Sequence, residues 1–134
     1  MRARNLTYDT SGSPFTDITR DVAAFVSEAS GDGLVNVFVP HATAGLACIE
    51  TGSGSEGDLD DALGRLLPRD DRYRHSHGSP GHGADHVLPA FLSPSLTVPV
   101  AGGEMALGTW QSIVLVDLNR DNPRRTVRLS LLEG

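Results

Sequence analysis

The sequence contains no lysine, and all eleven of its basic residues are arginine. This absence excludes Schiff-base chemistry, a lysine general base and the phosphate-binding lysine of Walker-type loops. Any anion must therefore be held by arginine, by backbone N–H groups or by a metal. The formal net charge of −6 argues against a basic surface for nucleic acid, so no nucleic-acid partner is expected.

Cysteine is nearly absent as well. The single Cys48 cannot form an internal disulfide, which suits a reducing cytoplasm, and its apolar neighbours predict a buried thiol. No apolar run is long enough to span a membrane, and the first residues lack the apolar core of a secretion signal, so we expect a cytoplasmic protein without membrane contact. A length of 134 residues with 39% hydrophobic content suits one domain over residues 1–134.

The hydrophobic pattern predicts an α+β fold. Apolar residues at helical spacing predict one helix from Thr19, its expected N-cap, to Gly31, and a second helix over residues 58–67. Alternating or continuous apolar runs predict strands at residues 5–10, 34–39, 44–50, 96–100, 105–107, 113–118 and 127–131. The strands at 34–39 and 44–50 are expected to be neighbours. This order of elements favours a mostly antiparallel sheet or sandwich with two main helices packed on it.

Four of the five histidines lie within residues 75–86, a run rich in glycine, serine and proline that predicts a loop. Imidazole is the commonest neutral metal ligand, and a three-ligand site with an open position needs side chains from separate elements. His41, His75 and His86 are placed to supply such a site. The alternative is a solvated polar loop whose histidines have no function.

Two other members of the run are further candidate ligands. They are His82 and Asp85, and Asp85 would otherwise orient the neighbouring histidine. His77 is assigned to solvent.

Several polar or aromatic residues interrupt or end apolar segments. Trp110, beside Gln111, is either a core residue or a platform for a heteroaromatic ring. Asp117 interrupts the apolar strand 113–118 and Glu50 ends another, and a carboxylate in such a position is exposed, paired or used as a general base. Three arginines near the C-terminus predict a solvated turn, with anion binding as the alternative; they are Arg120, Arg124 and Arg125.

Five segments occur together in an order that is specific to one family. They are Pro40-His41-Ala-Thr43-Ala-Gly45, Leu67-Pro68-Arg-Asp70, Tyr73-Arg-His75, His86 ahead of Thr97-Val-Pro99-Val, and Leu107-Gly-Thr-Trp110-Gln111. With these segments the chain closely resembles the YjbQ family, described as secondary thiamine-phosphate synthases. The resemblance covers nearly the whole chain from about Thr19.

The resemblance implies an α+β fold built around a β-sandwich, a homotrimer and a cleft that carries the shared histidines. It implies a metal or anion site on His41, His75 and His86, where the divalent metal would be zinc, magnesium or manganese. The catalytic positions that it implies are Glu50, Gln111 and Asp117. The substrate-binding positions that it implies are Thr43, Gly45, Arg74 and Trp110.

The activity implied by the resemblance joins a thiazole phosphate to a pyrimidine diphosphate with loss of pyrophosphate. It is a secondary activity in the family, so the physiological substrate, a small phosphorylated metabolite, is open. Two alternative functions are also compatible with these residues. One is a metal-dependent hydrolase, and the other is a trimer that binds a metal or metabolite without catalysis.

The chain departs from the family pattern at several positions. Leu88 stands where a basic residue is common, which removes one expected phosphate contact. His82 and Ala84 stand where the family has asparagine or aspartate, and Ala42 and Ile49 replace polar residues. The gain of His82 and Asp85 offers alternative ligands. These departures indicate a divergent branch of the family.

Overall fold

The structure is a computed structural model that describes residues 1–76 and 78–134. In these residues the elements follow the order β1 (Arg2–Asp9), β2 (Phe15–Asp17), α1 (Thr19–Val26), β3 (Gly33–Phe38), β4 (Gly45–Ile49), α2 (Ser55–Leu66), α3 (His82–Phe91), β5 (Ser95–Ala101), β6 (Glu104–Met105), β7 (Ser112–Val116) and β8 (Arg124–Glu133).

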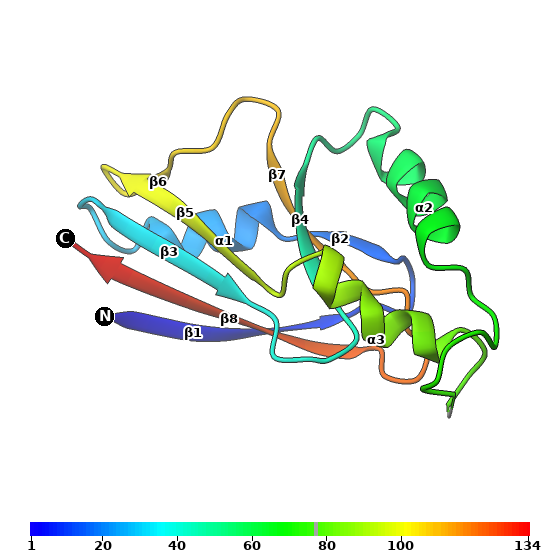
Figure 1. The fold of residues 1–134 in the computed structure, drawn as a ribbon. Coiled ribbons are helices and arrows are strands. Elements are labelled where there is room, and N and C mark those ends of the chain that lie inside the picture. The colour runs from blue at the N-terminus through cyan, green and yellow to red at the C-terminus, as the bar shows by residue number, and fades with distance from the viewer. Residues whose placement is uncertain (77) are drawn as a thin grey trace.

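The strands form two antiparallel sheets (Figure 1). The five-stranded sheet has the order β1-β8-β3-β5-β6, and the three-stranded sheet has the order β2-β7-β4. The α+β class and the antiparallel pairing are thus confirmed. β3 and β4, predicted as neighbours, instead lie in different sheets. The segment between them changes sheets, with Val39 N–H donating to Pro94 O and Leu46 N–H to Ser93 O.

The larger of two apolar cores fills the space between the five-stranded sheet, α1 and one face of the three-stranded sheet. It holds Ile18, Val22, Phe25 and Val26 around α1, Val35 and Val37 of β3, and Val127, Leu129 and Leu131 of β8. Every second residue of β3 and β8 points into this core, as the period of two for a half-buried strand requires.

The second core lies on the other face of the three-stranded sheet, beneath α2 and α3. β7 belongs to both cores. Ile113 and Leu115 face the first core, while Val114 and Val116 pack with Leu63 and Leu88 in the second. Burial on both faces explains why β7 is apolar at four consecutive positions.

α3 was not expected, because its first residues belong to the run that predicts a loop, and the helix breakers Gly83 and Pro89 lie within its sequence. Tertiary packing outweighs that propensity. Ala84 and Leu88 are buried against the three-stranded sheet, and a Cβ on Gly83 would lie 2.5 Å from His75 O. Glycine at position 83 therefore lets the first turn of α3 approach the backbone of His75.

The predicted helix boundaries also need correction. α1 ends at Val26 and not at Gly31. α2 begins at Ser55, three residues before the predicted start at residue 58. Thr19 is the first residue of α1 and not its N-cap, which is Ile18. The Thr19 hydroxyl instead donates to Asp17 Oδ1 at 2.6 Å and accepts from Ile113 N–H at 2.8 Å.

The expected burial of Cys48 is wrong. Its side chain is exposed, because β4 pairs only with β7 and is an edge strand. Leu46, two residues earlier on the same face of β4, is buried in the first core. The first core therefore ends between Leu46 and Cys48 on this face of β4. Among the described residues, no helix combines the length and hydropathy needed to cross a bilayer.

A buried ion pair joins the end of β7 to the start of β8. Arg125 Nε donates to Asp117 Oδ2 at 2.7 Å, and its Nη2 donates to Oδ1 at 2.9 Å. The hydroxyl of Thr10 donates to the same carboxylate at 2.6 Å, and Arg125 also donates to Thr43 Oγ1 at 2.8 Å. Arg125 is only 1% exposed, so its assignment to a solvated turn was wrong. Its alternation with Val127 along β8 turns it inward.

We expect Arg125→Met to lower the free energy of unfolding by about 3–5 kcal/mol, because Asp117 would remain charged in an apolar interior. Adding Asp117→Leu should recover part of that loss, since the pair would then be replaced by apolar contacts. Urea denaturation measures both. Arg128→Ala, at an exposed position of β8, is the control and should change stability by no more than about 0.5 kcal/mol. If Arg125→Met lowered the free energy of unfolding no more than this control does, the stabilising role of the Asp117–Arg125 ion pair would be contradicted.

Candidate functional site

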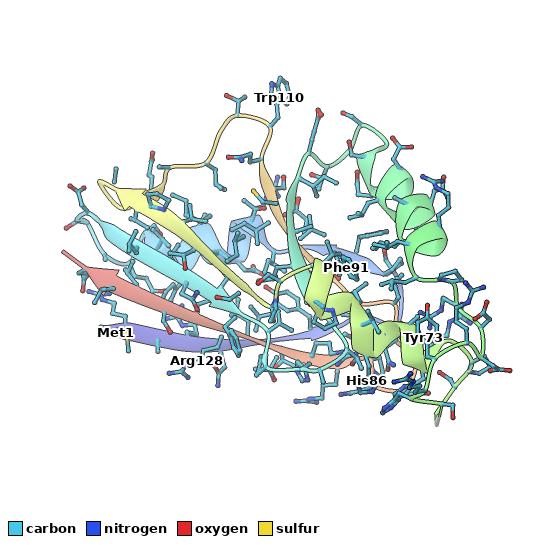
Figure 2. All side chains as sticks on the ribbon, viewed as in Figure 1. Met1, Tyr73, His86, Phe91, Trp110 and Arg128 are labelled. Carbon is cyan, nitrogen blue, oxygen red and sulfur yellow. The ribbon has the colours of Figure 1, made fainter. Side chains whose placement is uncertain are left out.

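Three histidines converge at the start of α3. One ring nitrogen from each of His75, His82 and His86 lies within 4.8 Å of the others. His82 and His86 are one turn apart on α3 and bring their Nε2 atoms to 2.9 Å, while His75 reaches them from the preceding segment. The ring centroids of His75 and His86 are 3.9 Å apart. Figure 2 shows His86 at this end of the molecule, near Tyr73.

The tautomer of His82 follows from its neighbours. Its Nδ1 lies 2.8 Å from Asp121 Oδ2, and an ionised carboxylate only accepts, so Nδ1 carries the proton and donates. Hydrogen bonds from Ser79 and then from His82 lower the pKa of Asp121, which stays ionised. In the neutral ring, the lone pair of His82 is then on Nε2, the atom that faces His86. This carboxylate–histidine arrangement is how proteins orient metal-binding imidazoles.

A second carboxylate supports the same turn of α3 from inside. Asp85 is 1% exposed and accepts a bidentate interaction from the guanidinium of Arg69. Asn119 Nδ2 donates to Asp85 Oδ2 at 3.0 Å and lies 3.2 Å from His82 Nδ1. The hydrogen bond and charge of Asp85 raise the pKa of Arg69. Asp85 thus binds Arg69 and Asn119, and its predicted role as a metal ligand or as the residue that orients His86 stays a prediction.

The histidine group has the dimensions of a metal site. A tetrahedral zinc with Zn–N bonds of about 2.0–2.1 Å separates its ligand nitrogens by roughly 3.4 Å. The observed spacings, 2.9 Å for one pair and at most 4.8 Å for the set, bracket this value. A cavity of about 20 Å³ borders His75 and His82, which is room for one water or ion.

His41 does not belong to this group among the described residues. Its Nε2 accepts a hydrogen bond of 2.9 Å from the backbone N–H of Thr126. Burial, and then the positive charge of Arg125, lower the pKa of His41 against a smaller opposing effect of Asp117. The three clustered histidines therefore include the expected His75 and His86, with His82 as the third member.

The other expected site residues lie at two ends of the β4–β7 ladder. Trp110 and Gln111 precede β7, and Glu50 follows β4, whose Ile49 pairs with Ser112. These three residues share one end of the ladder. Asp117 follows the opposite end of β7, and Figure 2 shows Trp110 far from His86. Trp110 is 72% exposed, so it is not the core tryptophan that was the alternative.

Structural roles account for several of these residues. The Thr43 hydroxyl is held by Arg125, and Gln111 Oε1 accepts from Gly108 N–H at 2.8 Å. A Cβ on Gly45 would lie 2.0 Å from Leu92 O, so only glycine fits at this crossing. Arg74 is exposed beside His75. His77 lies outside the described residues.

Three residues at the site were missed by the sequence analysis. They are Arg69, Asn119 and Asp121. The available signal was weak: four of the five residues in Asp117-Leu118-Asn119-Arg120-Asp121, at the end of an apolar strand, are polar, a pattern that also describes an ordinary surface turn.

The fold and the site define an α+β protein with two antiparallel sheets and a three-histidine group beside its third helix. The chain belongs to the YjbQ/UPF0047 family, since the family model described as UPF0047 protein YjbQ-like matches residues 4–134.

Relatives and solved structures agree with this assignment. UPF0047 protein Mb2586c of Mycobacterium bovis is 69% identical over 129 residues, 96% of this chain and 99% of that protein. UPF0047 protein YugU of Bacillus subtilis is 32% identical over 122 residues, and the match covers 87% of each chain. The hypothetical protein APE1520 of Aeropyrum pernix superimposes with a TM-score of 0.88 at 29% identity over 100% of both chains.

The pKa of His41 makes stability depend on pH. The unfolded histidine has a pKa near 6.5 and the folded one a lower value, so the unfolded chain binds the extra proton first as pH falls. The contribution of His41 is fully present above about pH 6.5 and decreases as pH falls toward the folded pKa. We expect the unfolding free energy of the wild type, minus that of His41→Gln, to decrease from pH 8 to pH 5 in urea denaturation. A constant difference would contradict this.

Proposed function

We propose that this protein is a metal-dependent enzyme whose ligands are His75, His82 and His86. The proposal rests on one observation. Three ring nitrogens converge within 4.8 Å of one another, beside a cavity with room for one water molecule or ion. Three protein ligands with a remaining open position are the usual composition of a catalytic zinc site. Imidazole suits zinc better than it suits magnesium or manganese, which prefer oxygen ligands, so zinc is the metal proposed.

The reaction proposed is that of a secondary thiamine-phosphate synthase, in which a thiazole phosphate joins a pyrimidine diphosphate and pyrophosphate leaves. A bound divalent metal supplies positive charge that stabilises the departing anion. Asp121 holds the proton on His82 Nδ1, and Asp85 anchors the first turn of α3 through Arg69 and Asn119. The exposed guanidinium of Arg74, next to His75, replaces the lysine that this chain lacks as a phosphate contact.

A cytoplasmic homotrimer is part of the same proposal. Glu50, Trp110 and Gln111 lie at the far end of the β4–β7 ladder from the histidines, so contact with the same substrate requires a second subunit. The high exposure of Trp110 within one subunit fits such a contact, because large exposed aromatic residues are enriched at interfaces.

Metal-dependent hydrolysis is the second candidate. The cavity beside His75 and His82, at about 20 Å³, has room for a single water molecule next to the histidines. A hydrolase and a transferase would share the ligand set, and they differ in whether water or a thiazole accepts the transferred group.

Zinc titration tests the ligand set. We expect the chelator-treated, untagged protein to bind one zinc per chain, and His75→Ala, His82→Ala and His86→Ala each to weaken binding by at least about tenfold. His41→Gln is the matched control and should bind zinc like the wild type, since His41 already accepts from Thr126 N–H. Isothermal titration calorimetry and elemental analysis measure this. Loss of zinc in His41→Gln with retention in His82→Ala would instead assign the site to His41, His75 and His86.

Complementation tests the reaction. We expect the wild-type chain to restore growth of a thiamine auxotroph that lacks its own synthase, and His86→Ala to fail at equal protein level. In vitro, zinc-loaded protein should release pyrophosphate from the pyrimidine diphosphate only when thiazole phosphate is present. Release of pyrophosphate without thiazole phosphate would identify a hydrolase. If no pyrophosphate is released with or without thiazole phosphate, the protein binds its ligand without catalysis.

A further inference from the structure

A cleft of about 650 Å³ lies beside the histidine group and contains none of the substrate-binding residues expected from the sequence. It is formed by residues 10–14 after β1, by residues 117–120 after β7, and by Asp60, Arg69 and Pro123. This volume is within the range of about 300–1,000 Å³ found for small-molecule sites.

The cleft and the histidines share a wall. Arg69 lines the cleft and makes the bidentate interaction with Asp85, one residue before His86. Asn119 also lines the cleft, and its amide nitrogen lies 3.2 Å from His82 Nδ1. A molecule in the cleft is therefore one side chain away from the three-histidine group.

The charges that line the cleft are unequally compensated. Asp117 is paired with Arg125, and Arg69 with Asp85. Among the described residues, Arg120 and Asp60 have no ion-pair partner within 4.0 Å, although both line the cleft. The guanidinium of Arg120 thus keeps its forked donors available, and such a fork matches the oxygens of a phosphate.

We propose that this cleft binds, through Arg120, a phosphate group other than the one that contacts Arg74, with the rest of that substrate extending along the wall toward the histidines. The negative charge of Asp60 repels a ligand in the same cleft that carries only negative charge. It favours a ligand that also carries a hydrogen-bond donor or a positive charge. The inference deepens the proposed function and rests on it for the histidine group as the reactive end. Phosphate binding itself requires no metal.

Titration with inorganic phosphate, followed by amide chemical shifts in chelator-treated protein, tests the cleft. We expect saturable shifts in residues 11–13 and 118–120, and a loss of affinity of about tenfold or more in Arg120→Ala, as for a hydrogen bond to a charged group. Arg120→Lys keeps the charge without the fork and should be intermediate. Arg20→Ala, at an exposed position of α1, is the matched control and should bind like the wild type.

The other lining charge without an ion-pair partner among the described residues, Asp60, gives an independent variant. Asp60→Asn should strengthen phosphate binding, whereas Asp61→Asn, the exposed neighbour outside the cleft lining, should have less effect. Phosphate shifts confined to other segments, unchanged affinity in Arg120→Ala, or acetate binding as tight as phosphate would each overturn the proposal. His75→Ala should bind phosphate normally without metal, so failure of the zinc site and failure of the cleft give different results.

Discussion

The buried pair of Asp117 and Arg125 is the interaction on which the rest of the site depends. It joins the end of β7 to the start of β8, and the hydroxyls of Thr10 and Thr43 complete its hydrogen bonding. At the start of the turn between the two charged residues, Asn119 N–H donates to Asp117 Oδ1 at 3.0 Å. Because one turn carries the residues that face both the histidines and the cleft, both sites depend on this pair.

A chain without lysine shows how arginine and carboxylates organise this end of the molecule. Arg125 and Arg69 each make two contacts with a carboxylate, and the fork of the guanidinium fixes both partners in one geometry. Arg69 thereby connects the cleft to the first turn of α3. Two more carboxylates act singly: Asp121 orients His82, and Asp60 faces the cleft without an ion-pair partner among the described residues.

The relation between sequence and structure differs from element to element. β8 alternates strictly, and its apolar positions Val127, Leu129 and Leu131 were assigned correctly from that period. α3 was missed because Gly83 and Pro89 oppose a helix locally, while the packing that overrides them comes from β7, nearly thirty residues away along the chain. Cys48 was misjudged for a related reason: an apolar neighbourhood in sequence does not say where the cover over an edge strand ends.

The sequence by itself determined the fold class, the family and the concentration of imidazoles after α2, because hydrophobic period and residue spacing are local properties. Only the tertiary structure decided which histidines meet. His82 joins His75 and His86 because α3 begins where Gly83 allows close backbone approach, whereas His41 is engaged by β8. The same holds for Arg125, whose burial depends on the carboxylate that it meets across the turn. Such convergence depends on distances between elements, which a linear pattern does not contain.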